Sequence, residues 1–499
     1  MNVKKLISMV LALVMLLAMS ATAMAEETQT YSYEIYQIFT GVYSGNHLTD
    51  VKWGKNGVGE VGKVVDEDIL EALETVNTST SNLEKLEVIL DYVNLESEPY
   101  ETGDAATYTL PNGYYLVKDV EGYLDGKEDA YTTYVVEVVD NTLTIERKTG
   151  VPSLEKKVKD ANDSTDTEDT VNDWQDSADH DINDVVDFKL TATLPKNYED
   201  YHQYKLVFHD EMSEGLSFTG KDDLKVYIDG KELGKDDYSV KTSDLVHGPD
   251  KECTFEVVIS DLKSIETENI TVTKESVITV EFKATLTEGA KIGAEGNPNT
   301  AYLEFSNNPN YIEDGTDEPT GETPKDTVIV FTYKVVVDKV DEDGEALSAA
   351  EFELYKKDSA GNEVLVGKVC KDEAGEYVVS GRAQVNETGD KFTWIGLDDG
   401  NYVIKETKAP AGYNSIADIK FTITAEHDVE SDDPRLTKLE GGNMFTGEIN
   451  KETGKLTGAL TAEIENKQGA TLPETGAQGT KMLYIVGGIL VAAAVILLI

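Results

Sequence analysis

Cysteine, tryptophan and histidine are scarce in this chain of 499 residues, which holds 2, 3 and 6 of them respectively. The two cysteines, Cys253 and Cys370, are too few and too far apart for a disulfide framework, although a secreted protein could carry one. The histidines lack the spacing of metal ligands. No Ser/His/Asp set, phosphate-binding glycine loop or zinc-protease motif is present. We therefore expect a protein that is not an enzyme and has neither cofactor nor metal.

Basic residues are also few, because 44 Lys and Arg stand against 95 Asp and Glu, which gives a net charge of −51. Nucleic acid and anionic lipid are therefore poor partners. Aspartates are densest between Asp160 and Asp187. This segment lacks the glycine and the terminal glutamate of an EF-hand loop, so we interpret it as a solvated acidic loop without Ca²⁺.

Each end of the chain carries an apolar run. Two lysines precede the stretch 6–19, and Ala23 and Ala25 then supply the small residues that signal peptidase requires. We therefore predict a signal peptide over 1–25. The second run, 482–499, contains no charged residue and would reach about 27 Å as a helix, so we predict a transmembrane helix there.

The rest of the chain has the pattern of a β-rich protein. Apolar and polar residues alternate in runs such as 134–139, 277–282 and 402–405, and Gly, Asn or Asp residues separate such runs. The 25 tyrosines suit pleated, half-exposed surfaces. One segment, 66–94, has helical periodicity instead, with apolar residues recurring on one face.

Two polar joints divide the chain. The first is 147–152, and the second, 307–324, is rich in Asn, Pro, Gly, Asp and Glu. The joints predict three domains and a spacer, over 26–147, 148–325, 326–467 and 468–481. Domains of this size with many short strands favour immunoglobulin-like β-sandwiches. We expect an all-β chain of tandem sandwiches, with a small helical insertion in the first.

A short motif precedes the terminal apolar run: Leu472-Pro473-Glu474-Thr475-Gly476. With the signal peptide and the terminal helix, it resembles the cell-wall sorting signal of Gram-positive sortase substrates. Its proline keeps the peptide extended for the enzyme. The resemblance implies that a sortase cysteine attacks the Thr475 carbonyl, releases Gly476 onward and passes Thr475 to an amine. No basic residue follows the apolar stretch, unlike in the family, so the sequence is truncated or a short tail suffices.

A lysine lies on an apolar row at the start of the third domain. Val335, Val337 and Lys339 alternate along one strand, so they point to the same face. A lysine on a core-facing row must reach solvent, pair with an acid or be consumed chemically. Taken alone, this strand leaves an edge lysine that reaches solvent as an equal alternative.

Three segments resemble, in the same order, strands of the collagen-adhesin B-type (CnaB) domain: 339–354, 402–413 and 463–467. The resemblance implies an isopeptide bond between Lys339 and Asn466, with Glu406 as the catalytic acid. In an apolar core a lysine is driven neutral and becomes nucleophilic, while a buried carboxyl is driven protonated. The acid can then polarise the carboxamide and shuttle protons as ammonia leaves.

The middle domain carries a looser version of the same plan. Three of its segments resemble the A-type (CnaA-like) isopeptide domain of pilins: 152–158, 206–216 and 296–302. In that domain an aspartate replaces the glutamate. The resemblance implies a bond between Lys156 and Asn299, with Asp210 as the catalytic acid. Lys157 remains an alternative to Lys156, because strand alternation alone separates the two.

The first domain has no comparable set. Its segments 33–39 and 113–119 look like strands of N-terminal pilin domains, and no lysine lies on the opening strand, so we predict no cross-link there. The resemblance to backbone pilins also implies a polymerisation lysine at the end of this domain. Lys148 has that position, although Glu146 and Arg147 stand where the family usually has Tyr-Pro. An ordinary linker lysine is the alternative.

Taken together, these resemblances imply the backbone subunit of a covalent pilus on a Gram-positive cell wall. The expected partners are a sortase, identical subunits, minor pilins and peptidoglycan. The precursor would be held at the membrane by its C-terminal helix. Two alternatives stay open, a monomeric wall-anchored adhesin for a host or matrix ligand and a tip or basal pilin. The small first domain favours the backbone subunit, because an adhesin usually has a large dedicated binding region.

Overall fold

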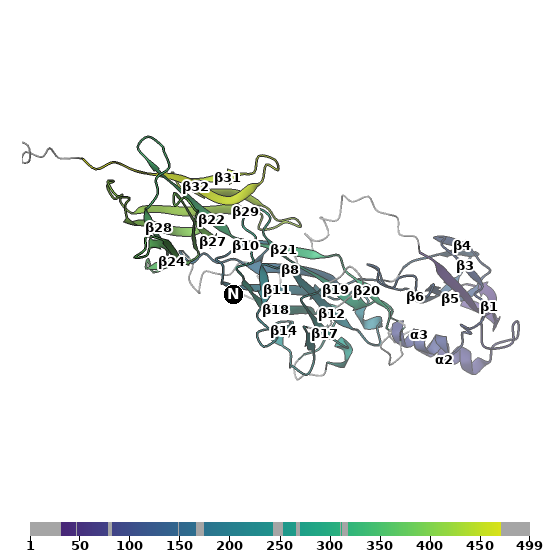
Figure 1. Cartoon of the computed structure of the whole chain (residues 1–499). Coiled ribbons are helices and arrows are strands. Elements are labelled where there is room, and N and C mark those ends of the chain that lie inside the picture. Colours follow the sequence, from purple (N-terminus) through teal and green to yellow (C-terminus); the bar gives the residue numbers. More distant parts are fainter. Residues whose placement is uncertain are drawn as a thin grey trace, which may run out of the picture.

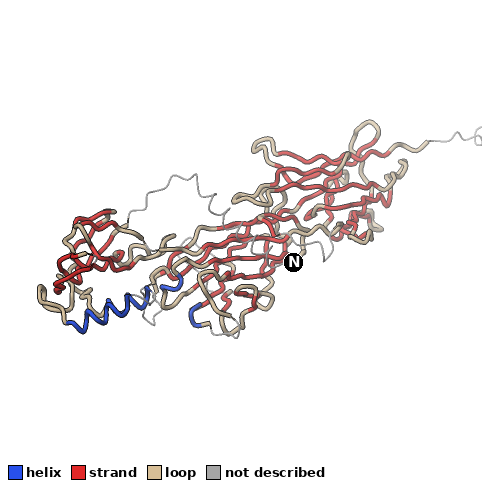
Figure 2. The backbone as a smooth tube through the Cα atoms, turned by 180° about the vertical axis from the view of Figure 1, so that it is seen from behind, coloured by secondary structure: helices blue, strands red, loops and turns tan. Residues whose placement is uncertain are grey.

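Three folded parts follow one another along an elongated molecule (Figure 1). The computed structural model describes residues 31–45, 47–77, 82–147, 149–165, 174–242, 253–265, 270–309, 311 and 318–470. The predicted signal peptide, the candidate acceptor Lys148, the sorting signal and the predicted transmembrane helix lie outside these residues. Within the described ranges, no helix is long and apolar enough to cross a membrane. Strands make up most of the fold, which confirms the all-β prediction (Figure 2).

The first part is a sheet with two helices on one face. The sheet order is β2-β1-β5-β6, with β3 also paired to β1, and β4 and β7 form a separate pair. The bounds are β1 Tyr33–Ser44, β2 His47–Trp53, α2 Glu67–Asn77, α3 Asn82–Leu90, β3 Glu101–Gly103, β4 Thr107–Thr109, β5 Gly113–Asp119, β6 Thr133–Val138 and β7 Thr142–Thr144. Leu86 and Ile89 of α3 pack on Ile38 of β1, while Ile35 packs on Leu143 across the other face. The helices fall inside the segment 66–94, where helical periodicity predicted them.

The middle part is a sandwich of two seven-stranded sheets. One sheet has the order β10-β21-β19-β12-β17-β16 with β20 on β19, and the other has the order β15-β14-β18-β11-β8-β9 with β13 on β18. The strands of the first sheet are β10 Ser177–Asp179, β12 Leu206–Met212, β16 Ser239–Lys241, β17 Phe255–Ile259, β19 Asn297–Ser306, β20 Thr320–Glu322 and β21 Asp326–Phe331. Those of the second are β8 Ser153–Lys159, β9 Trp174–Gln175, β11 Val185–Thr193, β13 Leu216–Phe218, β14 Lys225–Ile228, β15 Lys231–Glu232 and β18 Val277–Leu286. Two short 3₁₀ helices, η1 Tyr198–Asp200 and η2 Leu262–Ser264, join strands at the edges.

Alternation explains why these strands form a sandwich. Every second residue of β11 and β18 is buried, which is the pattern of strands with one face in a core. Phe188 and Phe282 are cross-strand partners whose rings stack with centroids 5.4 Å apart. They meet Phe208 and Leu303 from the opposite sheet in one apolar core. This core surrounds the candidate cross-linking residues of the middle part.

The third part is one 11-stranded sheet in the order β25-β24-β23-β28-β29-β30-β31-β32-β22-β27-β26. The bounds are β22 Tyr333–Asp341, β23 Glu351–Lys357, β24 Glu363–Lys371, β25 Tyr377–Gly381, β26 Ala383–Val385, β27 Lys391–Leu397, β28 Gly400–Lys408, β29 Ile419–His427, β30 Leu436–Gly441, β31 Phe445–Ile449 and β32 Leu456–Asn466. The first strand, β22, lies parallel to the last strand, β32. A bond between these neighbours would therefore join the two ends of the domain.

The junctions between the parts are made by backbone pairing. β21 pairs with β19 in the middle sheet, and a single residue, Thr332, separates it from β22 of the third part. The predicted boundary at 325 thus precedes the last strand of the middle sheet. At the other junction, the Tyr131 amide donates to the Asn307 carbonyl at 2.6 Å, and the Gly126 amide donates to the Thr320 carbonyl at 2.7 Å.

The acidic segment after β8 differs from its prediction. The prediction of a solvated loop is wrong for 174–184, because β10 lies in this stretch and pairs in parallel with β21. Asp176, Asp179 and Asp181 are buried there, at 9%, 3% and 6% exposure. The third part covers them, since the Asp176 amide donates to the Val429 carbonyl at 2.9 Å. Alternation and composition could not show this contact between distant segments.

Candidate cross-linking sites

Three strands bring Lys156, Asp210 and Asn299 together in the core of the middle part. Lys156 lies on β8 of one sheet, whereas Asp210 on β12 and Asn299 on β19 belong to the other. In the antiparallel register Asp210 is opposite Ala301, so Asn299 is its diagonal neighbour on the same face. Lys156 Nζ crosses the sandwich and donates a hydrogen bond to Asp210 Oδ2. All three side chains are fully buried.

The surroundings of Lys156 disfavour its charged form. Its Nζ lies 5.2 Å from the centroid of the Phe282 ring and 5.7 Å from that of Phe188. Burial lowers the pKa of Lys156, and burial raises the pKa of Asp210. Each group partly offsets the shift of the other through their contact. The pair is therefore disposed toward a neutral amine beside a neutral carboxyl, which is the state a nucleophilic lysine requires.

The carboxamide of Asn299 is poorly satisfied. Neither its Nδ2 nor its Oδ1 makes a hydrogen bond of normal geometry with a described residue, and the same holds for Asp210 Oδ1. The carboxamide still lies close enough to Asp210 to lower the pKa of that carboxyl. An unsatisfied buried polar group costs about 1–3 kcal/mol, so this carboxamide is held at the site by the fold rather than by its own hydrogen bonds.

Lys157, the alternative to Lys156, and the nearby Asn297 make contacts away from this site. Lys157 directs its Nζ to Asp176 Oδ1 at 2.7 Å and Glu430 Oε2 at 2.9 Å, and these acids raise its pKa against the effect of burial. Asn297, two residues before Asn299, accepts the Lys291 amide at 2.8 Å and donates to the Val330 carbonyl at 3.0 Å. Lys157 therefore forms ion pairs with Asp176 and Glu430, and Asn297 hydrogen-bonds to the backbone of Lys291 and Val330.

The third part brings Lys339, Glu406 and Asn466 together at its end. Lys339 lies on β22 opposite Ile464 of β32, so Asn466 is its diagonal neighbour on the parallel strand. Asn466 Nδ2 donates to Glu406 Oε1 at 2.9 Å and to Oε2 at 3.1 Å. Lys339 and Asn466 are buried, at 1% and 0% exposure. The carboxylate thus faces the nitrogen that would leave as ammonia.

Lys339 has no carboxylate in direct contact. Its Nζ donates to the carbonyl oxygens of Val340 at 2.9 Å and Ile464 at 2.8 Å. Burial lowers the pKa of Lys339 to about 8, against a smaller opposing effect of Glu406. A substantial fraction of the amine is therefore neutral near pH 8.

Backbone groups that the sequence did not reveal hold these residues in place. The Asn414 carbonyl accepts from Asn466 Nδ2 at 3.0 Å, and the Ile416 amide donates to Glu406 Oε2 at 3.1 Å. In the middle part, Asp326 Oδ2 accepts the Lys156 amide at 2.6 Å. A backbone amide or carbonyl can come from any residue type, so the sequence cannot indicate such partners. Asp326 is the one side-chain partner among these three groups, but its spacing from Lys156 does not predict the contact.

Two protein families match the parts that carry these sites. Residues 182–309 match the family described as Gram-positive pilin backbone subunit 2, Cna-B-like domain. Residues 333–434 match the family described as SpaA, prealbumin-like fold domain. Residues 182–309 are thus similar to a domain of Gram-positive backbone pilins. The family that matches the middle part is described as Cna-B-like, whereas the sequence analysis found a resemblance to the A-type domain.

Individual pilins are also similar to this chain. The trypsin-resistant surface T6 protein of Streptococcus pyogenes serotype M6 is 28% identical over 291 residues, which cover 56% of this chain and 46% of the relative. The chain thus spans about half the length of that relative. The solved T6 backbone pilin of serotype M6 Streptococcus pyogenes is 18% identical, with a TM-score of 0.48 and coverage of 88% of this chain and 96% of that one. The major pilin SpaD of Corynebacterium diphtheriae is 18% identical, with a TM-score of 0.46 and coverage of 88% and 93%.

The first part of the chain differs from the other two. Its opening strand, β1, contains no lysine. Next to the candidate acceptor Lys148, which is outside the described residues, Arg147 is folded against the domain. Arg147 Nη1 pairs with Asp119 Oδ1 at 2.7 Å, and its guanidinium lies 3.8 Å from the centroid of the Tyr31 ring. Arg147 thus fixes the chain to the first part immediately before the acceptor position.

The two cysteines do not join parts of the molecule. Cys253 and Cys370 are both free thiols. Cys253 lies in the middle part, with its Sγ 3.7 Å from His209 Nδ1, and Cys370 lies on β24 of the third part. Disulfides therefore do not stabilise the described pilin domains.

Proposed function

We propose that this chain is a structural backbone subunit of a covalent surface pilus, polymerised and wall-anchored through Thr475. The observation that carries the proposal is the recurrence, in both domains, of a buried lysine and a buried asparagine with a carboxylic acid beside them. In each domain the lysine is on the opening strand and the asparagine is on a late strand. Such sets suit permanent internal cross-links, which a load-bearing fibre needs and a freely soluble protein does not.

In the third domain, the neutral Lys339 amine attacks Cγ of Asn466. The Nζ–Cγ bond forms and the Cγ–Nδ2 bond breaks. Glu406 takes a proton from Nζ and passes it to Nδ2, so that ammonia leaves and an amide remains. The hydrogen bonds from Nδ2 to both Glu406 oxygens keep this carboxyl group next to the nitrogen that receives the proton. The reaction occurs once per domain, so the chain acts on itself and turns over no substrate.

In the middle domain, Lys156 plays the part of the amine and Asn299 that of the carboxamide. The Lys156 Nζ already donates to Asp210, and the raised pKa of Asp210 favours the protonated acid that can polarise the carboxamide. The bond joins β8 of one sheet to β19 of the other. It therefore ties the two halves of the sandwich directly.

These bonds define the route of tension through a fibre. Load that enters at Lys148 would reach Lys156, cross to Asn299, follow β19 and β21 into β22, and cross from Lys339 to the last strand. The loops between the bonded residues then carry no load. The sorting signal lies just beyond the last strand, so the route ends at Thr475.

Polymerisation requires an acceptor amine, for which we propose Lys148. In the sequence it directly follows Arg147, whose guanidinium pairs with Asp119 of the first domain. Lys156 and Lys339 are buried and could not enter a sortase active site. The proposed partners are a pilus or housekeeping sortase, identical subunits, minor pilins and peptidoglycan.

A blot of cell-wall extract boiled in detergent tests this function. Antibody against the subunit should detect a ladder of high-mass species, because covalent links survive detergent. Thr475→Ala should remove the ladder and leave precursor in the membrane fraction. A single wall-bound band in the wild type would contradict the proposal and favour a monomeric adhesin.

A further inference from the structure

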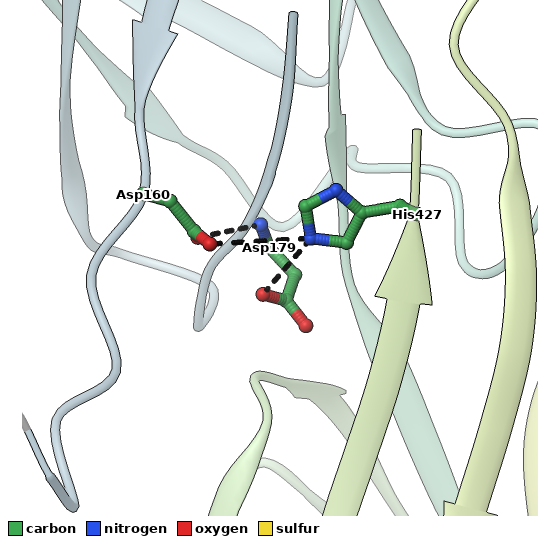
Figure 3. Close-up of side chains that lie close together, drawn as sticks. All are labelled: Asp160, Asp179 and His427. Carbon is green, nitrogen blue, oxygen red and sulfur yellow. Dashed lines mark hydrogen bonds and ion pairs between the residues drawn. The ribbon is translucent and has the colours of Figure 1, made fainter. Parts of the chain in front are cut away.

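A small cluster of acids and one histidine lies between the middle and third domains, away from both cross-linking sites. Asp160 follows β8, Asp179 ends β10, and His427 ends β29 (Figure 3). Asp160 and Asp179 belong to the middle domain, and His427 belongs to the third domain. One ligand atom from each lies within 4.8 Å of the others. The side chains of Asp179 and His427 are 4% and 7% exposed.

The hydrogen bonds of Ser177 fix the tautomer of His427. The Ser177 hydroxyl donates to the Asp428 carbonyl at 2.6 Å, so its oxygen is left to accept. His427 Nδ1 lies 2.7 Å from that oxygen and therefore carries the proton. This is the arrangement in which a ligating histidine donates its second N–H to a neighbouring acceptor. His427 Nε2 is then free to offer a lone pair to the cluster.

The distances around Nε2 suit a shared ion better than hydrogen bonds. His427 Nε2 is 3.7 Å from Asp179 Oδ1 and 4.0 Å from Asp160 Oδ2, beyond hydrogen-bonding range. Two ligands of one zinc ion are about 3.4 Å apart at metal–ligand distances near 2.1 Å. A small inward movement of the side chains would bring all three atoms to one ion.

The charge at this junction is not balanced by the described residues. Asp179, Asp398 and Asp399 also bring oxygens within 4.8 Å of one another. The nearby cation, Lys356, is engaged by three acids, at 3.0 Å from Asp163, 3.1 Å from Asp181 and 3.0 Å from Asp398. Arg382 pairs with Asp181 at 2.9 Å. A buried carboxylate without a counter-charge is costly, so Asp179, with the partly exposed Asp160 and Asp399 beside it, favours a bound cation.

An independent observation points to a missing ligand. Asp179 is 97% buried, since its exposure is 3%, and its Oδ2 makes no normal hydrogen bond with a described residue. The hydroxyl of Tyr333 lies near this carboxylate and is likewise buried without a partner of normal geometry. Asp179 Oδ2 is thus a buried carboxylate oxygen without a hydrogen bond of normal geometry among the described residues.

We propose that Asp160, Asp179 and His427 bind a divalent transition-metal ion of the Zn²⁺ or Mn²⁺ type, and that this ion clamps the middle domain to the third. One imidazole with two carboxylates, completed by water, suits such ions, whereas a pure Ca²⁺ site is built from oxygen alone. The ion links strands from both domains and stiffens the junction through which the chain passes from β21 to β22. The proposal does not depend on polymerisation or on the internal cross-links.

Calorimetric titration of the untagged full chain in detergent, stripped of metal by a chelator, tests the site. ZnCl₂ and MnCl₂ should each bind at one site and raise the melting temperature. His427→Gln should abolish both effects, and Ser177→Ala should weaken binding by about tenfold because it removes the acceptor for Nδ1. His202→Gln is the matched control, since His202 faces Glu87 at another junction, and it should bind as the wild type does.

A zinc-soaked crystal locates the ion without any substitution. An anomalous peak should lie between His427 Nε2 and the two carboxylates. The proposal is overturned by a peak elsewhere, by unchanged zinc affinity in His427→Gln, or by a chain that binds CaCl₂ but neither ZnCl₂ nor MnCl₂. Metal-free melting of each variant establishes that it is folded.

Discussion

The cross-link of the third domain gives the sharpest quantitative prediction. Glu406→Gln keeps the size of the side chain and an oxygen that can accept from Asn466 Nδ2, but removes the group that relays the proton. The bond between Lys339 and Asn466 should then not form. In the wild type the proposed bond would close a loop of about 130 residues. By the chain-entropy relation for cross-links, that closure stabilises the domain by about 5 kcal/mol.

The expected shift in melting temperature follows from this free energy. A domain of this size shifts by roughly 3 °C for each kcal/mol, so the third domain should melt about 15 °C lower in Glu406→Gln. Intact-mass spectrometry should show that the variant retains one ammonia that the wild type has lost. Differential scanning calorimetry should show the lower transition.

The control is Glu465→Gln, a neighbouring exposed glutamate on β32 that makes no hydrogen bond to Asn466. It should retain the cross-link and the wild-type melting temperature. The reasoning is refuted if Glu406→Gln shows the same ammonia loss as the wild type. It is also refuted if the bond is absent and melting is unchanged.

Three further predictions concern the middle domain, pH and polymerisation. Asp210→Asn should retain the ammonia that the middle domain would otherwise lose, and it should have a lower melting temperature than the wild type. Glu211→Gln, at the exposed neighbouring position, should show neither effect. An ammonia loss in Asp210→Asn equal to that of the wild type would contradict this. In Asn466→Ala, Lys339 stays unbonded, and its pKa is about 8 in the folded state against the ordinary 10.5 in the unfolded state. Between these two pH values the unfolded state binds more protons than the folded state. Stability should therefore rise with pH in that window. Urea unfolding checks the slope, and Lys339→Met in the same background should remove it. Lys148→Ala should abolish the detergent-resistant ladder but leave both ammonia losses intact, and an undiminished ladder would place the acceptor elsewhere.

The fold class could be predicted because its signals are local. Alternating residues in β11 and β18 and helical periodicity in 66–94 each depend on neighbours a few residues apart. The same alternation separated Lys156 from Lys157, and in the structure Lys156 Nζ contacts Asp210 in the core whereas Lys157 Nζ pairs with Asp176 and Glu430. Periodicity thus predicted which way a side chain points.

The parts that failed depend on distant contacts. The burial of Asp179 requires His427 and the third domain, which come from remote parts of the sequence. Composition therefore suggested a solvated loop. The site lysines could be proposed from their strands, but their supporting groups could not.

Tandem mass spectrometry of peptides from wild-type fibres tests the central claim most directly. The account predicts a branched peptide in which the Thr475 carbonyl is joined to the Lys148 side chain, together with internal Lys156–Asn299 and Lys339–Asn466 bonds. Fibres in which Thr475 is joined only to peptidoglycan, with no link between subunits, would contradict it.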